Sequence, residues 1–404
     1  MFGAGRTPRG GALLENGKDV LSSLDALLGE IVVDQTVSDV PIGLFLSGGL
    51  DSTAVAYYLS RHGNPPQAFC AYFDSGGEAF NEIDKARSVA RHLGLSLNEL
   101  RVRPDVEEAL EALVQAFDEP MADSSALPTF WISRQARRHV KVALTGIGGD
   151  EMFGGYPRYL GARFLETYSM LPVPLRIGLA RVGTWVPETV SSRNIGGWIR
   201  RFLGSGGLSP QHAYARWMGH LSLQDRNALM APPLLAAAYT PAPLQAFEGA
   251  CGDFLSRVFS VDLATYLADD LLTLADRAGM AVGLELRVPL CDVRLVEFMR
   301  GLPTSARMRG WRLKPLLKDI LRGRLPKDIL SQKKQGFMAP LGNWFKGELK
   351  PLVEDSLAGL SRRGLLRGEG LATLWQEHLS GGRNRADVLW ALVFLERWLR
   401  RYHP

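Results

Sequence analysis

The chain has 404 residues, enough for two domains or for one domain with a large addition. Its hydrophobic content of 46% and charged content of 22% are those of an ordinary soluble globular protein. The formal charge of +5 suits an anionic small substrate and does not demand a nucleic acid.

The cysteines and the apolar stretches indicate the compartment. Cys70, Cys251 and Cys291 are widely spaced and form neither a CxxC nor a zinc pattern, which argues against a disulfide framework. No apolar core of a signal peptide opens the chain. The most apolar later stretch, residues 229–247, is interrupted by four prolines. We therefore expect a cytoplasmic protein with no membrane segment.

Residues 1–16 are rich in Gly and Arg, and we expect them to be poorly ordered. Apolar residues at helical spacing follow, and then apolar runs typical of buried strands alternate with helical patterns. Strands are expected at 42–46, 67–73, 96–102 and 140–144, and helices at 18–35, from 52 onward, at 82–93, at 106–117 and up to about 139.

Strands that alternate with helices in this way predict an α/β fold with a doubly wound parallel sheet. Beyond residue 159 the alternation stops, and helical stretches with aromatic residues and prolines follow. We therefore predict an α/β core over residues 17–160 and a mainly helical part over 161–404, whose last helix spans 386–402. The ligand of such a sheet binds at the carboxyl ends of the strands.

The first such strand end carries Ser47-Gly48-Gly49-Leu50-Asp51-Ser52 and then a helix. The two glycines let the backbone approach an anion, the serines add hydroxyl donors, and Asp51 offers a carboxylate to magnesium. This is not a Walker A loop, because it lacks the Gly-Lys-Ser/Thr ending. It resembles the pyrophosphate-binding loop of N-type ATP pyrophosphatases.

A second glycine loop follows the strand at 140–144. It reads Gly146-Ile147-Gly148-Gly149-Asp150-Glu151 and repeats the design of the first loop, with backbone donors beside a carboxylate. The alternative is an ordinary helix start, where acidic residues favour the helix dipole. Together with the first loop, we interpret it as functional.

With both loops, the chain resembles the synthetase half of class B asparagine synthetases from about Leu21 to its end. Three later segments are similar to motifs of that family: 118–129, which begins Asp-Glu-Pro, 276–292 with Asp-Arg and Glu-Leu-Arg-Val-Pro, and 325–337, which matches the segment bearing the catalytic lysine. The resemblance implies ATP-dependent amidation. A carboxylate is adenylated with release of pyrophosphate, and ammonia or an amine then displaces AMP.

The resemblance also implies the site residues and the cofactors, ATP and Mg²⁺. Lys334, Asp51 and Asp150 would be catalytic, and the two aspartates would share the metal. The nucleotide would be bound by Leu46, Ser47, Gly48, Gly49, Asp51, Ser52, Ala71, Gly146 and Gly148. Without the resemblance, Lys334 is one more solvated charge in a basic stretch.

Several positions depart from the family pattern. No nucleophilic cysteine follows Met1, so we expect no glutaminase half and no hydrolysis of glutamine by this chain alone. Ile147 stands where asparagine-forming members carry an acid that assists proton removal from the attacking nitrogen. In addition, an expected Arg, Ser, Phe and Leu are replaced by Gln332, Gly279, Leu290 and Cys291.

These departures leave the acceptor open. It could be aspartate, a sugar carboxylate, or a peptide or natural-product carboxylate, and ring-forming relatives such as β-lactam synthetases and lasso-peptide cyclases use an internal amine. The chain could also be the synthetase subunit of a split enzyme with a separate glutaminase. An RNA-modifying ATP pyrophosphatase gains from the isoelectric point of 9.1 but lacks the zinc and persulfide cysteines.

The proposed role of Lys334 predicts a contrast with its neighbour. A cation placed where negative charge develops in the transition state raises the reaction rate by roughly 10²- to 10³-fold. Lys334→Ala should therefore collapse turnover while ATP binding weakens little, and Lys333→Ala should do much less. Steady-state kinetics of both variants checks this. Equal losses would indicate a diffuse basic surface, and a larger loss at Lys333 would mean that the motif is aligned one residue out.

Overall fold

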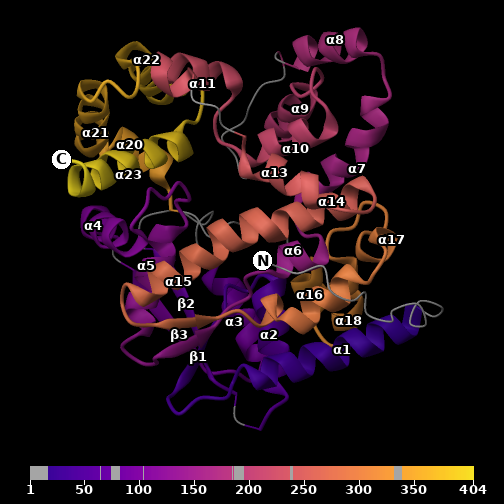
Figure 1. Ribbon diagram of the computed structural model, residues 1–404. Helices are drawn as coiled ribbons and strands as arrows, with labels where there is room; N and C mark the ends of the chain where they lie inside the picture. Colours follow the sequence, from indigo (N-terminus) through magenta and orange to yellow (C-terminus); the bar gives the residue numbers. More distant parts are fainter. Residues whose placement is uncertain are drawn as a thin grey trace.

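Five parallel strands form one sheet in the order β3-β2-β1-β4-β5 in the computed structural model (Figure 1). The structure describes residues 17–63, 65–73, 82–102, 104–183, 185, 195–236, 240–331 and 339–404. The predictions made for residues 1–16, Gln332, Lys333 and Lys334 lie outside the described residues.

The strands are β1 (Ile42–Phe45), β2 (Gln67–Phe73), β3 (Leu97–Val102), β4 (Val142–Leu144) and β5 (Glu285–Arg287). The helices of the first half are α1 (Gly17–Asp34), α2 (Leu50–Ser60), α3 (Ile83–Leu93), α4 (Val106–Phe117), α5 (Ala126–Ala136), α6 (Gly149–Phe153), α7 (Pro157–Ser169), α8 (Val173–Gly183) and α9 (Ile195–Leu203).

The second half adds α10 (Pro210–Met218), α11 (Leu223–Leu229), α12 (Pro232–Ala236), α13 (Ala242–Gly249), α14 (Phe254–Asp262), the π-helix η3 (Leu263–Leu272), α15 (Thr273–Met280), the 3₁₀ turn η4 (Pro289–Cys291), α16 (Val293–Arg300), α17 (Thr304–Arg307), α18 (Pro315–Leu321), α19 (Lys327–Ser331), α20 (Leu341–Lys346), α21 (Lys350–Arg362), α22 (Gly368–Leu379) and α23 (Ala386–Tyr402). No helix in the described part of the chain is long and apolar enough to cross a membrane.

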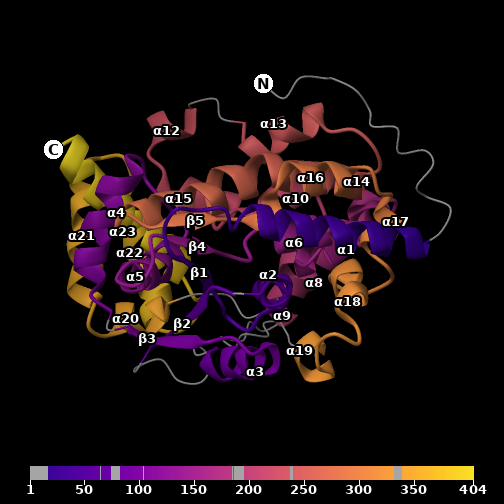
Figure 2. The ribbon, with the colours of Figure 1, turned by 90° about the horizontal axis from the view of Figure 1, so that it is seen from below.

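Strand β2 shows why both faces of the sheet are covered. Ala68 and Cys70 pack in one apolar cluster with α1, α2, α3 and α18, whereas Phe69 and Ala71 pack in a second with α4, α5 and α20 to α23. Alternate side chains of a strand point to opposite faces, so an apolar strand needs helices on both. Figures 1 and 2 show the two helix groups on opposite sides of the strands. The predicted α/β doubly wound fold is confirmed.

Sequence patterns located most of the core elements. The strand at 67–73 and the helices at 106–117 and 386–402 have the predicted bounds, and the other predicted strands lie within two residues of them. Strand β5 was missed, because three residues with the sequence Glu-Leu-Arg carry no periodicity. It joins the sheet beside β4 from the segment that we assigned to the helical part. The domain boundary near residue 160 stays a prediction.

A third apolar cluster, formed by α7, α10, α13 and α14, lies away from the sheet. Its centre is polar: the fully buried Asp262 accepts hydrogen bonds from the hydroxyls of Tyr159 and Tyr214 at 2.7 and 2.8 Å, and from the Arg158 guanidinium at 2.8 Å. A buried carboxylate is tolerated when it is paired and hydrogen-bonded in this way. From Asp262 the chain continues through η3 into α15, so one helical run from 254 to 280 joins this cluster to the sheet (Figure 1).

Candidate active site

The two predicted glycine loops meet because their strands are neighbours. Leu44 of β1 lies beside Leu144 of β4 in parallel register, so both strands end at the same edge of the sheet. Beyond that edge, Gly146 lies against the start of α2, where a Cβ atom would stand 2.5 Å from the backbone nitrogen of Ser52. Only glycine permits this approach. The pairing predicted from sequence is thus present in the structure.

The first loop is held in place by its own polar groups. Gly48 has a φ of +76°, and a Cβ atom there would lie 2.5 Å from the Cβ of Lys85. The hydroxyls of Ser47 and Ser52 lie 3.0 Å apart, and that of Ser52 donates to the carbonyl of Gly49 at 3.1 Å. No side chain of the described residues caps α2, whose N-terminus follows Gly49. The N-terminal end of such a helix favours an anion.

A buried lysine lies between the two predicted metal ligands. The ammonium nitrogen of Lys314 is 2.5 Å from Asp51 Oδ2 and 2.7 Å from Asp150 Oδ1. Lys314 precedes α18 in the left-handed region, with a φ of +53°. Its N–H donates to the carbonyl of Gly154 at 3.4 Å, so its backbone is tied to the end of α6. The site therefore combines two carboxylates and one cation from three separate parts of the chain.

Charge explains why this lysine can be buried. Burial alone lowers the pKa of Lys314, but the carboxylates of Asp51 and Asp150 outweigh burial and leave its pKa above the ordinary value. Lys314 therefore stays an ammonium ion. Two carboxylates that converge on one positive charge also fit Mg²⁺, which is bound through one or two carboxylates together with the oxygens of substrate phosphates. Asp51 and Asp150 would hold such an ion.

Sequence analysis missed Lys314. It lies in a basic stretch whose charges we treated as solvated, and its neighbours Leu313, Pro315, Leu316 and Leu317 are all apolar. A single charge inside an apolar run is a signal for a buried, paired side chain, because an unpaired charge is not tolerated there. Lys334, the lysine that we did predict, lies in the stretch 332–338 that the structure leaves undescribed.

Side chains that hydrogen-bond to α6 hold this helix, which carries Asp150, in place. The buried Arg307 donates to the carbonyls of Glu151 and Met152 at 3.2 and 3.1 Å, and its guanidinium lies 3.8 Å from the ring centre of Phe259. Burial lowers the pKa of Arg307 to about 10. The carboxylate of Glu151, also buried, accepts a hydrogen bond from the Tyr156 hydroxyl at 2.5 Å. These contacts fix the second loop in a single position.

The π-helical segment η3 carries Asp270, on which the charges of Asp123 and Arg158 act. Burial, followed by the charge of Asp123, raises the pKa of Asp270 to about 7, and the charge of Arg158 offsets part of this effect. The oxygen Oδ1 of Asp270 is buried and accepts no hydrogen bond from the described residues. Asp270 is therefore partly protonated near neutral pH. Such π-helical stretches occur often at functional sites.

Ile147 does not replace the missing acid. Its side chain packs against the apolar cluster below the loop, which also receives Cys291. The Cys291 thiol donates to the carbonyl of Ile147 at 3.5 Å, and burial raises its pKa to about 12. Nearby Gly148 has a φ of +91°, and a Cβ atom there would collide with the Cys291 sulfur. The departures at 147 and 291 thus form one apolar contact under the loop.

The remaining predicted residues lie at the same edge of the sheet. Leu46 is buried, and its N–H donates to the carbonyl of Phe69 at 2.9 Å, which extends the pairing of β1 with β2. Ala71, also buried, lies two residues further along β2. Their assignment to nucleotide binding stays a prediction.

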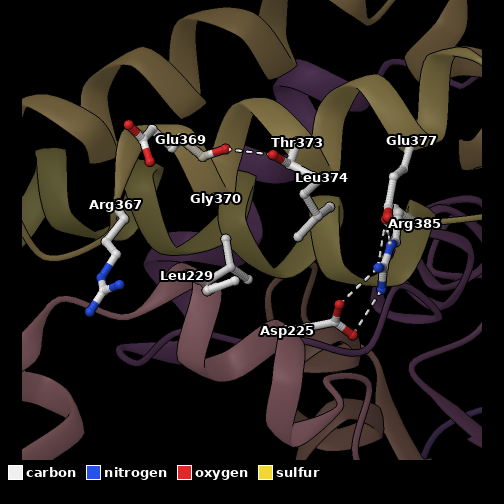
Figure 3. A pocket seen from close by; sticks show the side chains of 10 residues that line it. Asp225, Leu229, Arg367, Glu369, Gly370, Thr373, Leu374, Glu377 and Arg385 are labelled. Carbon is white, nitrogen blue, oxygen red and sulfur yellow. Dashed lines mark hydrogen bonds and ion pairs between the residues drawn. The ribbon is translucent and has the colours of Figure 1, made fainter.

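A cavity of about 330 Å³ lies elsewhere, between α11 and α22. Figure 3 shows Arg385 at one end of the cavity between Glu377 and Asp225, and its guanidinium pairs with both carboxylates, at a shortest distance of 2.9 Å from Asp225. These charges satisfy one another and tie α11 to α22 and to the start of α23. None of the predicted site residues lines this cavity, so we assign it a structural role.

Comparison with known proteins supports the family that the sequence motifs resemble. A family model described as asparagine synthase matches residues 23–400. The chain is 31% identical to a Mycobacterium tuberculosis protein assigned as a glutamine-hydrolysing asparagine synthetase, over 95% of this chain and 58% of that protein. It is 27% identical to glutamine-hydrolysing asparagine synthetase 1 of Bacillus subtilis, over 96% and 61%. Amidase chry2 of Gibberella zeae is 23% identical, over 87% and 57%. The chain thus spans about three fifths of the length of these relatives.

Removing Lys314 should leave the buried carboxylate of Asp150 and the half-buried carboxylate of Asp51 without a cation. Breaking a buried ion pair by removing one partner costs about 3–5 kcal/mol, so Lys314→Ala should lower the free energy of unfolding by that amount. Mg²⁺ should restore more stability in this variant than in the wild type, which chemical denaturation with and without Mg²⁺ measures. The exposed Lys327 is the control. If Lys314→Ala and Lys327→Ala behaved alike, the buried ion pair would be refuted.

Asp270 should make stability depend on pH. Its pKa is near 7 in the folded state and near 4 in the unfolded chain, so the folded state binds more protons between these values. This contribution to stability is full below about pH 4 and is lost as the pH rises through about 7. Asp270→Asn should remove that loss, whereas Asn at the exposed neighbour Asp269 should not. Denaturation midpoints of the wild type and of Asp270→Asn and Asp269→Asn, measured at about pH 5 and about pH 8, test this prediction. If the midpoints of the two variants changed with pH in the same way, the raised pKa assigned to Asp270 would be contradicted.

Proposed function

Because this chain belongs to the asparagine synthase family, we propose that it is an ATP-dependent ligase that joins a carboxylate to a nitrogen nucleophile. The observation that carries the proposal is the convergence of Asp51 and Asp150 from neighbouring strands on one positive charge. Both carboxylates stand next to a loop whose backbone is arranged for an anion. A binding module would need the loop but not a buried pair of metal-binding carboxylates.

In the first half-reaction, a carboxylate oxygen attacks the α-phosphorus of ATP, an acyl-adenylate forms, and pyrophosphate leaves. The N–H groups at Gly48 and Gly49 and the hydroxyls of Ser47 and Ser52 would bind the leaving pyrophosphate. Contacts within the loop hold these groups close together, and the Gly49 N–H and the Ser52 hydroxyl would exchange their bonds inside the loop for bonds to the phosphates. The N-terminus of α2 adds its partial positive charge.

Asp51 and Asp150 would bind Mg²⁺, and the ion would neutralise charge on the phosphates when bound. Lys314 lies beside the same carboxylates and brings a second positive charge to the polyphosphate. Because its pKa is raised, it carries that charge throughout the neutral range. Arg307 holds the backbone of α6, so the carboxylate of Asp150 keeps its position relative to Asp51.

In the second half-reaction, ammonia or an amine attacks the acyl carbon and AMP leaves. We assign stabilisation of the tetrahedral carbon to Lys334, as the motif predicts. Ile147 packs against the apolar cluster and offers no proton acceptor. This favours acceptors and amines other than those of asparagine formation, such as a peptide, glycan or natural-product carboxylate, or a ring closure with an internal amine.

The nitrogen source is a separate part of the proposal. The relatives from Mycobacterium tuberculosis and Bacillus subtilis are named for glutamine hydrolysis, and this chain matches about three fifths of their length. Neither Cys70, which is buried, nor Cys291, which is half-buried, fits a nucleophile, because burial raises the pKa of both thiols to about 12. We infer that the site accepts ammonia or an amine of the substrate, and a separate glutaminase subunit in the cytoplasm is one source of that ammonia.

Asp51→Ala tests the proposed function. The variant should lose carboxylate-dependent release of pyrophosphate by at least about 10²-fold, because it removes a metal ligand and the partner of Lys314. A coupled pyrophosphate assay over a panel of carboxylates measures the loss. The exposed Asp84 provides the control, Asp84→Ala, which should keep full activity. Unchanged turnover by a folded Asp51→Ala protein would end the assignment.

A further inference from the structure

Helix α8 buries a charged side chain and exposes apolar ones. The side chain of Arg176 is buried, and its guanidinium donates to the carbonyls of Leu171 and Leu208 at 3.0 and 3.2 Å. In contrast, Val173, Leu175, Ile177 and Val182 of the same helix are exposed, Val182 by 66%. A surface helix of a soluble protein normally buries its apolar residues and exposes its charges. The outward face of α8 is therefore suited to an apolar surrounding.

This reversal is part of a larger exposed apolar surface. The large apolar residues that are exposed concentrate between positions 170 and 199, where they comprise Met170, Leu171, Val173, Leu175, Ile177, Val182, Trp185, Trp198 and Ile199. Trp185 is 88% exposed and Met170 is 81% exposed. Helices α8 and α9 lie together at the end of the molecule furthest from the strands (Figure 1). We call these nine residues the α8–α9 surface. A patch of this kind marks an interaction site.

The charged residues of α8 and α9 are all arginines, and neither helix carries an acidic residue. Arg176 is buried, whereas Arg181 on α8 and Arg201 on α9 are exposed, and Arg201 also donates to the carbonyl of Trp217 at 3.3 Å. Apolar tips together with arginine are the composition of helices that lie on anionic lipid bilayers, where tryptophan prefers the interface.

We propose that the α8–α9 surface docks this protein on an anionic membrane. The apolar side chains enter the headgroup region, and the positive charge of the two helices attracts anionic lipids. A second copy of the chain is a poorer occupant, because two such surfaces would oppose arginine to arginine. The expectation of no membrane segment, drawn from the sequence, concerned stretches that span a bilayer, whereas this surface lies on one.

A vesicle assay tests the proposal. The full chain is sedimented with vesicles of phosphatidylcholine mixed with phosphatidylglycerol, and with vesicles of phosphatidylcholine alone. It should bind the anionic vesicles at least about tenfold better, and salt should weaken binding, because the arginines are screened. The double variant Val182→Ser/Trp198→Ser should lose at least about tenfold in partitioning. Since both side chains are exposed, its denaturation midpoint should not change.

The matched control is Val37→Ser/Val293→Ser, which removes two exposed valines, 76% and 63% accessible, from a different surface. This control should bind like the wild type. Failure of the wild-type chain to bind anionic vesicles, or an equal loss in the control, would overturn the proposal. So would a concentration-dependent dimer, or a complex with an acidic protein, that disappears in the Val182→Ser/Trp198→Ser variant while vesicle binding is absent.

Discussion

Two neighbouring carboxylates that are largely withdrawn from water require a cation between them, and the structure around the active site satisfies that requirement. Asp150 is buried and Asp51 half-buried, and both begin helices that follow neighbouring strands, so their proximity follows from the order of the sheet. Their mutual repulsion is offset by Lys314, at 2.5 and 2.7 Å. Removing Lys314 or one of the two carboxylates would leave an uncompensated charge. The loops, α6 and the start of α18 are therefore constrained together.

The same constraint explains the neighbouring packing. Glycines at 146 and 148 admit the backbone of α2 and the sulfur of Cys291, and Arg307 closes the carbonyl end of α6. The helical run from 254 to 280 then carries Asp270 to this edge from the cluster around Asp262. Along this line, Asp262 and Glu151 are buried carboxylates that accept hydrogen bonds from tyrosine hydroxyls. Other buried polar side chains, such as Glu396 and His378, are paired separately in the helical part of the chain.

The sequence predicted what is encoded locally. Strand, glycine turn and helix at 42–60 follow from adjacent residues, and so do the second loop and the parallel α/β sheet. The partners of Lys314 and of β5 could not be found in this way, because they lie more than a hundred residues away. The three residues of β5 have no periodicity, and the apolar neighbours of Lys314 indicate a buried charge without identifying Asp51 and Asp150 as its partners. Whether Ile147 faced the ligand or the core also depended on packing.

The central claim is that the chain activates a carboxylate by adenylation at the Asp51–Asp150 pair. The most direct measurement is the identity of the products that the purified protein forms from Mg-ATP and an acceptor carboxylate, followed by phosphorus NMR across the substrate panel. The account predicts equal amounts of AMP and pyrophosphate, with oxygen from a labelled carboxylate transferred to AMP. ADP and orthophosphate, or AMP that carries no label from the carboxylate, would contradict it.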